Sequence, residues 1–173
     1  MAVTFNSKVD PKAKTELFKI YVDVSEDGTE ELELQGRGIT NWTIDQNQEM
    51  TVQSDVLGYN DFERGNPKPQ QSVELALRKN SKLGELLFEA WFKNDMSALD
   101  SMTIVQKFEF VSSTVQTSCL ARKQVGCAMN ITSFQGEAEN YLKFGVDIYY
   151  SNNILTGTMP TIDGDPPVFN ADT

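Results

Sequence analysis

Histidine is the side chain that acid–base catalysis and zinc binding use most often, and this sequence contains none. Its absence excludes Ser-His-Asp and Cys-His catalysis and the commonest zinc sites. The GxSxG, GxxxxGK[ST] and GxGxxG motifs are absent as well. Asp163-Gly164-Asp165 matches part of a calcium-binding loop, but no glutamate follows at the required spacing, so a turn is the better interpretation. We therefore expect no enzymatic activity, no cofactor and no metal ion.

The two cysteines, Cys119 and Cys127, are the remaining candidates for nucleophilic or metal chemistry. Two thiols cannot form a four-thiolate metal site, and their spacing matches no CxxC motif. A hairpin through residues 121–126 could bring them together, although a cytosolic origin favours free thiols. We expect both to be buried or half-buried and without a chemical role.

Carboxylates are numerous, and their distribution is uneven. Residues 23–63 hold eleven acidic side chains and one basic side chain, Arg37, so this segment carries the whole net charge of −10. The 14 acids and 14 bases elsewhere cancel. The segment is either a hairpin kept soluble by its acids or a surface that faces something negative without binding it. Tight nucleic-acid binding needs the opposite sign of charge and is disfavoured.

The length of 173 residues fits one domain. No window approaches the roughly 18 consecutive apolar residues that span a membrane, and the first residues lack an apolar core of signal-peptide length. We expect a soluble chain of cytosolic origin, with no membrane association.

Hydrophobic periodicity predicts about seven strands. Residues 18–24 alternate, with Phe18, Ile20 and Val22 on the apolar face, and a turn at Glu26-Asp27-Gly28 leads to a strand with Leu32 and Leu34 inward. Further strands are predicted over residues 49–57 (apolar residues Met50, Val52 and Val56), 73–77, 102–111, 118–134 with a break near 123–126, and 141–150. Residues 36–48 and 59–71 are predicted as long loops.

One helix is predicted, from Lys82 to Lys93, with Ser81 as N-cap and Asn94 closing the far end. Phe88 and Phe92 widen its apolar face beyond one stripe, which fits either a broad core contact or a second contact surface. Connection lengths favour antiparallel pairing. We predict a mainly β fold, an antiparallel β-sandwich or barrel with one helix (residues 17–157), between an extended N-terminal arm (1–16) and a C-terminal arm (158–173) without periodicity from Thr156.

Several short motifs in this order resemble the major tail tube proteins of long-tailed, siphovirus-type bacteriophages. The stretch from Gly126 to Phe134, GCAMNITSF, is similar to the family's penultimate strand, and Tyr149-Tyr150 followed by Leu155-Thr156-Gly157 is similar to its closing strand. Residues 38–43, GITNWT, resemble the segment before the family's long loop, and the helix stands where the family has its single helix. The resemblance covers residues 18–157.

This resemblance implies a structural virion protein. The family forms hexameric rings that stack into a tail tube, the conduit for double-stranded DNA, assembled in the host cytoplasm with a tape measure protein, a tail terminator and a distal tail or baseplate protein. Both arms and the long loop contact neighbouring subunits in the family. Their counterparts here imply inter-subunit contacts through Phe5, Val9, Arg37, Ile39, Trp42, Ile44, Met159, Ile162, Val168 and Phe169.

The acidic segment fits this role, because a wall with the charge of DNA prevents sticking. Strand alternation places the polar side chains of two strands opposite their apolar ones. The residues predicted to face the lumen are Glu31, Glu33, Glu49, Thr51, Gln53 and Asp55.

Two other classes of protein stay open at this point. A carbohydrate- or protein-binding β-sandwich module would need exposed aromatic side chains on one face, and the candidates are Trp42, Tyr59, Phe62, Tyr149 and Tyr150. A glycosidase needs only two carboxylates, but no acid here stands in the apolar sequence setting that a general acid requires.

Overall fold

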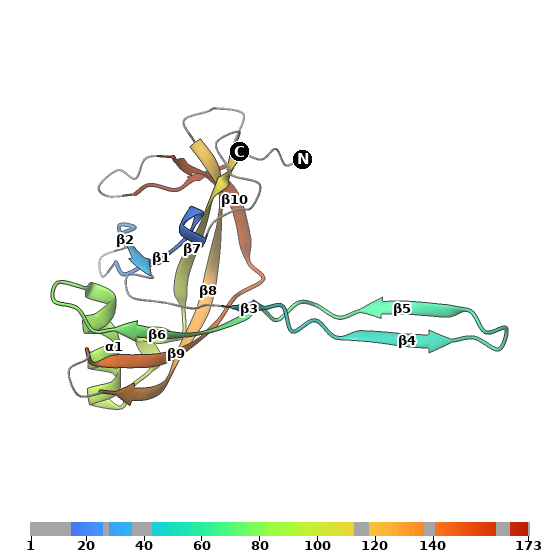
Figure 1. Ribbon diagram of the computed structural model, residues 1–173, viewed down its shortest axis with the longest axis horizontal. Coiled ribbons are helices and arrows are strands. Elements are labelled where there is room, and N and C mark those ends of the chain that lie inside the picture. Colours follow the sequence, from blue (N-terminus) through green and yellow to red (C-terminus); the bar gives the residue numbers. More distant parts are fainter. Residues whose placement is uncertain are drawn as a thin grey trace.

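The computed structural model describes residues 15–25, 28–35, 43–112, 118–136, 141–161 and 167–172 (Figure 1). All strand pairs in these ranges are antiparallel, and they contain a single α-helix, as predicted. The strands are β1 (Phe18–Asp23), β2 (Leu32–Gln35), β3 (Ile44–Asp45), β4 (Met50–Ser54), β5 (Asn60–Arg64), β6 (Gln70–Ala76), β7 (Met102–Ser112), β8 (Ser118–Gln135), β9 (Lys143–Tyr149), β10 (Ile154–Pro160) and β11 (Asn170–Ala171). The helix is α1 (Lys82–Lys93), and 3-10 turns cover Thr15–Leu17 and Ser97–Leu99.

Nine strands form one sheet, and two form a separate hairpin. The sheet runs in the order β2-β1-β7-β8-β9-β6-β3, with β10 paired to β8 and β11 paired to β10. The end strands β2 and β3 do not pair, so the described sheet is not a closed barrel. Strands β4 and β5 pair only with each other.

The 18-residue strand β8 connects the two halves of the sheet, because it pairs with β7 and β10 along its first part and with β9 along its second. The register with β7 shifts by one residue at Gly126, since Met102 lies opposite Cys127 and Thr103 lies opposite Val125. Gly126 has a φ of +79°, a left-handed conformation that disfavours residues with a Cβ. The break predicted near 123–126 is therefore a β-bulge within one continuous strand.

The main core lies where the sheet folds around α1. Ile20 and Val22 of β1 lie in it with Leu87 of α1 and Phe144 of β9, and all four are almost fully buried. The apolar face predicted for residues 18–24 is confirmed, because Val24 is buried in the same cluster and Phe18 packs against it.

The helix boundaries agree with the prediction. Ser81 caps the N-terminus by accepting a hydrogen bond from the Gly84 amide (3.0 Å), and Asn94 ends the helix in a left-handed conformation with a φ of 52°. A Cβ on Gly84 would lie 3.2 Å from the Ser81 hydroxyl oxygen. The cap therefore explains a glycine in the first turn, where helix propensity alone disfavours it.

A second, smaller core lies on the other face of β1 and β7. It contains Tyr21, Leu32, Val105, Ala121 and Met159. Leu32 is inward as predicted, although its partners are those of this second cluster. Strand β1 is therefore covered on both faces.

Two predictions about loops and arms are wrong. Residues 59–71 are not one long loop, because Asn60–Arg64 forms β5 and β6 begins at Gln70. The segment after Thr156 is not a featureless arm, because β10 continues to Pro160 in register with β8 and Met159 is only 1% exposed. Met159 packs in a small buried cluster with Tyr21, Leu32 and Val105. Pro160 is compatible with the strand because it is the last residue of β10.

Candidate functional site

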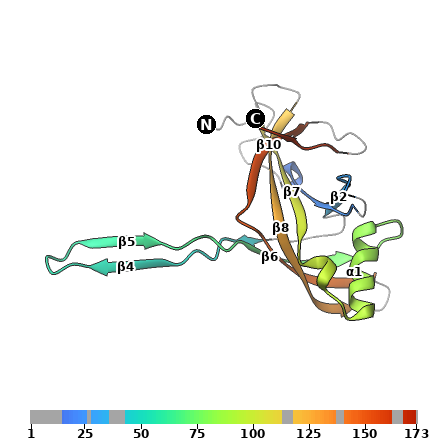
Figure 2. The ribbon, with the colours of Figure 1, turned by 180° about the vertical axis from the view of Figure 1, so that it is seen from behind.

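The hairpin of β4 and β5 is the most unusual feature of the surface. It projects from the body of the protein on the side opposite α1 (Figures 1 and 2). Five residue pairs connect the strands, from Met50–Arg64 to Ser54–Asn60. Backbone hydrogen bonds extend the ladder at the base (Lys68 N–H to Gln46 C=O, 2.9 Å). The hairpin therefore stays paired along its length.

The tip is a tight turn held by Asp55. Its Oδ1 atom accepts hydrogen bonds from the amides of Leu57 (2.8 Å) and Tyr59 (2.9 Å). Gly58 has a φ of +82°, which the turn requires and which L-residues with a side chain rarely adopt. Asp55, predicted as a lumen residue, thus has a structural role in the turn.

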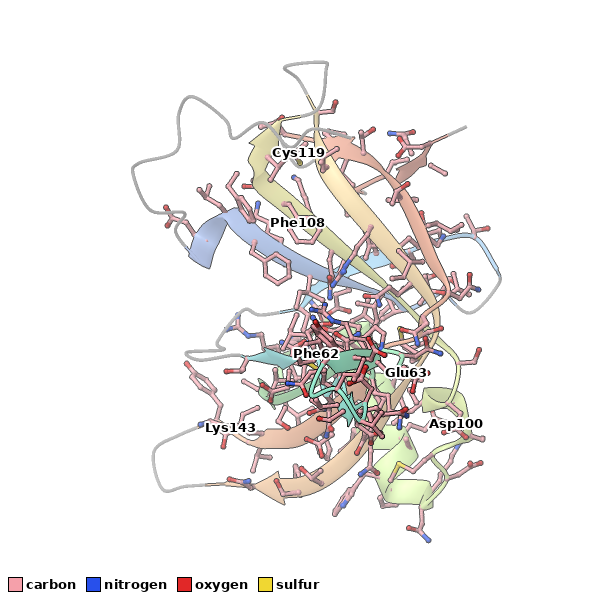
Figure 3. The ribbon with its side chains drawn as sticks, turned by 90° about the vertical axis from the view of Figure 1, so that its right-hand side faces the viewer. Phe62, Glu63, Asp100, Phe108, Cys119 and Lys143 are labelled. Carbon is pink, nitrogen blue, oxygen red and sulfur yellow. The ribbon has the colours of Figure 1, made fainter. Side chains whose placement is uncertain are left out.

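Cross-strand pairing gives the hairpin two different faces, because directly opposed residues share a face. One face, here called the apolar hairpin face, consists of Met50, Val52, Phe62 and Arg64. The other pairs Thr51 with Glu63 and Gln53 with Asp61, and is polar and acidic. Figure 3 looks along the hairpin, and Phe62 and Glu63, which belong to its two different faces, are labelled there.

The apolar hairpin face is not part of the core. Val52 is 52% exposed and Phe62 is 66% exposed, and every residue of β4 and β5 is exposed. The apolar residues of the predicted strand 49–57, Met50, Val52 and Val56, are therefore all exposed within a single chain. An isolated two-stranded hairpin is only marginally stable in water, so an ordered one with an apolar face indicates a binding surface.

Two further acids predicted to face a lumen, Glu31 and Glu33, lie at the N-terminus of α1. Glu33 accepts hydrogen bonds from the Ser81 hydroxyl (2.6 Å) and the Leu83 amide (2.9 Å), and Glu31 forms an ion pair with Lys82 (2.5 Å). In the register of β2 with β1, Glu33 lies opposite Val22 and shares the face of the main core. The Glu33 carboxylate therefore caps the helix within the chain, and its assignment to a lumen stays a prediction.

The acidic segment thus divides into two groups with different surroundings. Asp23 accepts amide hydrogen bonds from Ser25 and Glu31, and Glu30 pairs with Lys123. These acids serve the fold, together with Glu31 and Glu33. The acids left exposed on β3 and the hairpin are Asp45, Glu49, Asp55, Asp61 and Glu63.

The residues predicted at inter-subunit contacts have different outcomes. Phe5, Val9, Arg37, Ile39, Trp42 and Ile162 lie outside the described residues. Met159 is buried within the chain and is unavailable as a surface contact. Ile44 packs against the main core and Phe169 against the second core, both partly buried. Val168 is exposed.

The aromatic residues that would form a binding platform are not gathered on one face. Tyr59 and Phe62 are exposed on the hairpin and Tyr149 is exposed on β9, whereas Tyr150 is buried and donates a hydrogen bond to Gln71 Oε1. Burial raises the pKa of the Tyr150 hydroxyl strongly. Trp42 lies outside the described residues.

Both cysteines are free and buried, as predicted. The hairpin that would have joined them does not exist, because Cys119 and Cys127 lie on the same strand, β8. Burial raises the pKa of the Cys127 thiol, so the reactive thiolate is disfavoured.

A cavity of about 400 Å³ lies between β2, the end of β6 and the start of α1, lined by side chains that include Leu34, Gln35 and Leu87. The part of the chain that the structure describes contains no group of three or more Cys, Asp or Glu side chains arranged to hold a metal ion. It also contains no helix long and apolar enough to cross a membrane.

Similar solved structures come from tail tubes and related tubes, and the likeness is one of fold. A chain of the SPP1 tail tube superimposes with a TM-score of 0.55 at 11% identity, covering 83% of this chain and 77% of that one. A chain of the sheath/tube terminator of PVC, an extracellular contractile injection system, gives a TM-score of 0.53 at 10% identity, covering 86% and 98%. A chain of the PVC sheath–tube complex gives 0.51 at 9% identity, covering 88% and 98%.

This protein therefore has the tail tube fold, as the sequence resemblance implied. No family model and no curated protein matches the sequence itself. The likeness is one of structure, without close sequence identity.

Proposed function

We propose that this chain is the structural subunit of a tail tube, without enzymatic activity or a cofactor. Six copies form a ring, and rings stack into a tube through which double-stranded DNA passes. The tube is a virion component assembled in the host cytoplasm. Its other partners are a tape measure protein in the lumen, a terminator at one end and a distal tail or baseplate protein at the other.

The observation that carries this proposal is the hairpin. The paired, projecting β4–β5 unit leaves an apolar face exposed in the single chain, and the similar structures come from a tail tube and from tube complexes. Burying Met50, Val52 and Phe62 against another copy would stabilise both the hairpin and the assembly.

The acidic face of the hairpin supplies the wall of the conduit in this proposal. Glu49, Asp61 and Glu63 are exposed and share it with the uncharged Thr51 and Gln53. In a ring of six, even two inward acids per subunit place about twelve negative charges in each layer, within reach of a Debye length of roughly 8–10 Å. Such a wall repels DNA rather than binding it.

Negative-stain electron microscopy of the purified protein, with sedimentation over a concentration series, tests the assembly. We expect rings and tubes from the intact chain. Replacing residues 47–66 by a short Gly-Ser turn should leave a folded monomer that forms neither, because no hairpin residue contributes to the two cores. An intact chain that stays monomeric at millimolar concentration would refute the proposal.

A matched pair of point variants separates the apolar face from the acidic one. Val52→Asp places a charge on the apolar hairpin face, and Gln53→Asp places the same charge on the opposite face of the same strand. We expect Val52→Asp to prevent tube formation and Gln53→Asp to permit it, with equal thermal stability of the two monomers.

A second candidate function is that of a tube terminator. The terminator structure of PVC and the terminating cap of the anti-feeding prophage tube also superimpose, with TM-scores of 0.53 and 0.50. The same microscopy distinguishes the two roles, since a terminator gives single rings without extended tubes.

A further inference from the structure

Helix α1 carries an exposed aromatic surface that the core does not use. It consists of Phe88, Trp91 and Phe92, here called the aromatic helix face, and Phe92 is 73% exposed. The core side of the helix is formed by Leu83, Leu87 and Ala90. Phe88 and Phe92 stand at i and i+4 and lie on the solvent side. The broad apolar face predicted from the sequence is thus two surfaces: one packs on the core, and the aromatic helix face is exposed to solvent.

The aromatic helix face is held in place from beneath. Phe88 stacks on Phe92 with ring centroids 5.9 Å apart, and Trp91 packs on Phe134 at 4.6 Å. Phe134 in turn contacts the fully buried Phe144 at 4.9 Å. Because the rings rest on the core, the surface is preorganised for a contact and loses little side-chain freedom on binding.

The apolar hairpin face is a second exposed apolar surface among the described residues, and it lies on the opposite side of the body (Figures 1 and 2). From Gln46 to Val56 the hairpin extends on the order of 30 Å at about 3.4 Å per residue. Its ladder is paired from base to tip, so it cannot fold back onto α1 of its own chain. Among the described residues, neither surface can cover the other within one chain.

The charges beside the two surfaces are complementary. Arg64 lies on the apolar hairpin face opposite Met50, and it is exposed without an ion pair among the described residues. Glu85 precedes Phe88 by three residues and Phe92 by seven, which places it on the same helical stripe. It too is exposed without an ion pair in the described part of the chain. The nearby Glu89, by contrast, pairs with Lys93.

We propose that the apolar hairpin face of one copy docks on the aromatic helix face of a second copy, with Phe62 against Phe88 and Phe92 and with Arg64 paired to Glu85. This inference rests on the proposed function and specifies the surface that receives the hairpin. Because the two surfaces lie on opposite sides of one chain, the contact is heterologous. Heterologous contacts repeat head to tail and give rings or filaments rather than closed dimers.

The size of the contact indicates how it forms. The three apolar side chains of the hairpin face present on the order of 300 Å² of surface, taking about 150–250 Å² for a large side chain and about half to two-thirds of it exposed. A stable pairwise interface buries about 800 Å² per partner. One such contact is weak, so isolated pairs of molecules dissociate. Assembly is cooperative, because each copy then makes two such contacts, one through its hairpin and one through its helix.

Disulfide trapping tests the contact directly. Two chains are prepared, one with Phe62→Cys and one with Phe92→Cys, mixed under assembly conditions and oxidised. Cys119 and Cys127 are buried and do not compete. We expect mixed dimers from this pair. The matched control mixes Gln53→Cys, on the opposite hairpin face, with Phe92→Cys, and should give at least about tenfold less cross-linking. Equal yields from both pairs would overturn the proposal.

Charge exchange provides the second measurement. Arg64→Glu and Glu85→Arg should each raise the critical concentration for assembly about tenfold or more. The double variant, which restores opposite charges, should return to within about threefold of the original protein. Additive defects in the double variant would overturn the pairing. Tubes that form without the 62–92 cross-link would overturn this inference and leave the proposed function intact, whereas a chain that never assembles would overturn the proposed function.

Discussion

Replacing Glu33 by alanine distinguishes a structural carboxylate from a lumen-facing one. The Leu83 amide is the second amide of α1, and its hydrogen bond to Glu33 (2.9 Å) satisfies a donor that has no partner within the helix. The Ser81 hydroxyl, which caps Gly84, also donates to Glu33 (2.6 Å). Glu33 therefore holds the whole cap in place, and the truncation affects two residues besides itself.

The expected loss follows from these contacts. Removal of a helix cap costs about 1 kcal/mol, and leaving a partly buried donor unpaired adds roughly 1–2 kcal/mol. Glu33→Ala should lower the free energy of unfolding by about 2–3 kcal/mol, which corresponds to roughly 5–10 °C in Tm for a chain of this length. Glu33→Gln keeps an acceptor and should cost about half as much, because only the charge is lost.

Urea unfolding of the monomer, followed by circular dichroism, measures this loss, and Glu31→Ala is the matched control. Glu31 lies two residues before Glu33, just ahead of β2, and its ion pair with Lys82 is half exposed, with side-chain exposures of 46% for Glu31 and 53% for Lys82. Such pairs contribute about 0–1 kcal/mol. If Glu33→Ala and Glu31→Ala destabilise the protein equally, or if Glu33→Lys leaves the monomer unaffected, the assignment of Glu33 as a cap is refuted.

Two further outcomes are expected. Truncation after Gly157 should destabilise the monomer, because it removes the buried Met159 and the end of β10. The expected loss in urea unfolding is about 2–5 kcal/mol, the range for deleting a large buried side chain. Truncation after Thr161 is the control and should cost much less. Alkaline pH should lower stability, because burial raises the pKa of Tyr150, so that above about pH 10 the unfolded chain releases a proton that the folded chain retains. Tyr150→Phe should flatten the fall in the free energy of unfolding between pH 10 and 12, and an unchanged slope would contradict this account.

The local elements of this protein could be predicted from the sequence because their causes are local. Alternation identified β1, and the caps Ser81 and Asn94 identified both ends of α1. The mainly β class with one helix follows from the same patterns. The free state of the cysteines was also predicted, from the expected cytosolic origin, whereas their placement on one strand came from the structure.

The orientation of each apolar face was decided only by the tertiary structure. Alternation shows that Met50 and Val52 share a face, but period-two alternation is the same whether that face packs on a core or contacts another molecule. The same ambiguity affects β2, where Leu32 faces the second core and Glu33 faces the first. A strand that is covered on both sides has no polar face to assign.

The division of the acidic segment likewise required the fold. Net charge is a property of the sequence, and the concentration of acids between residues 23 and 63 is evident without coordinates. Whether a carboxylate caps a helix, closes a turn or stays in solvent depends on amides and cations brought close from elsewhere in the chain. Ser81 and Leu83 lie about fifty residues from Glu33 in sequence, and only the folding of β2 against the start of α1 places them within hydrogen-bond distance.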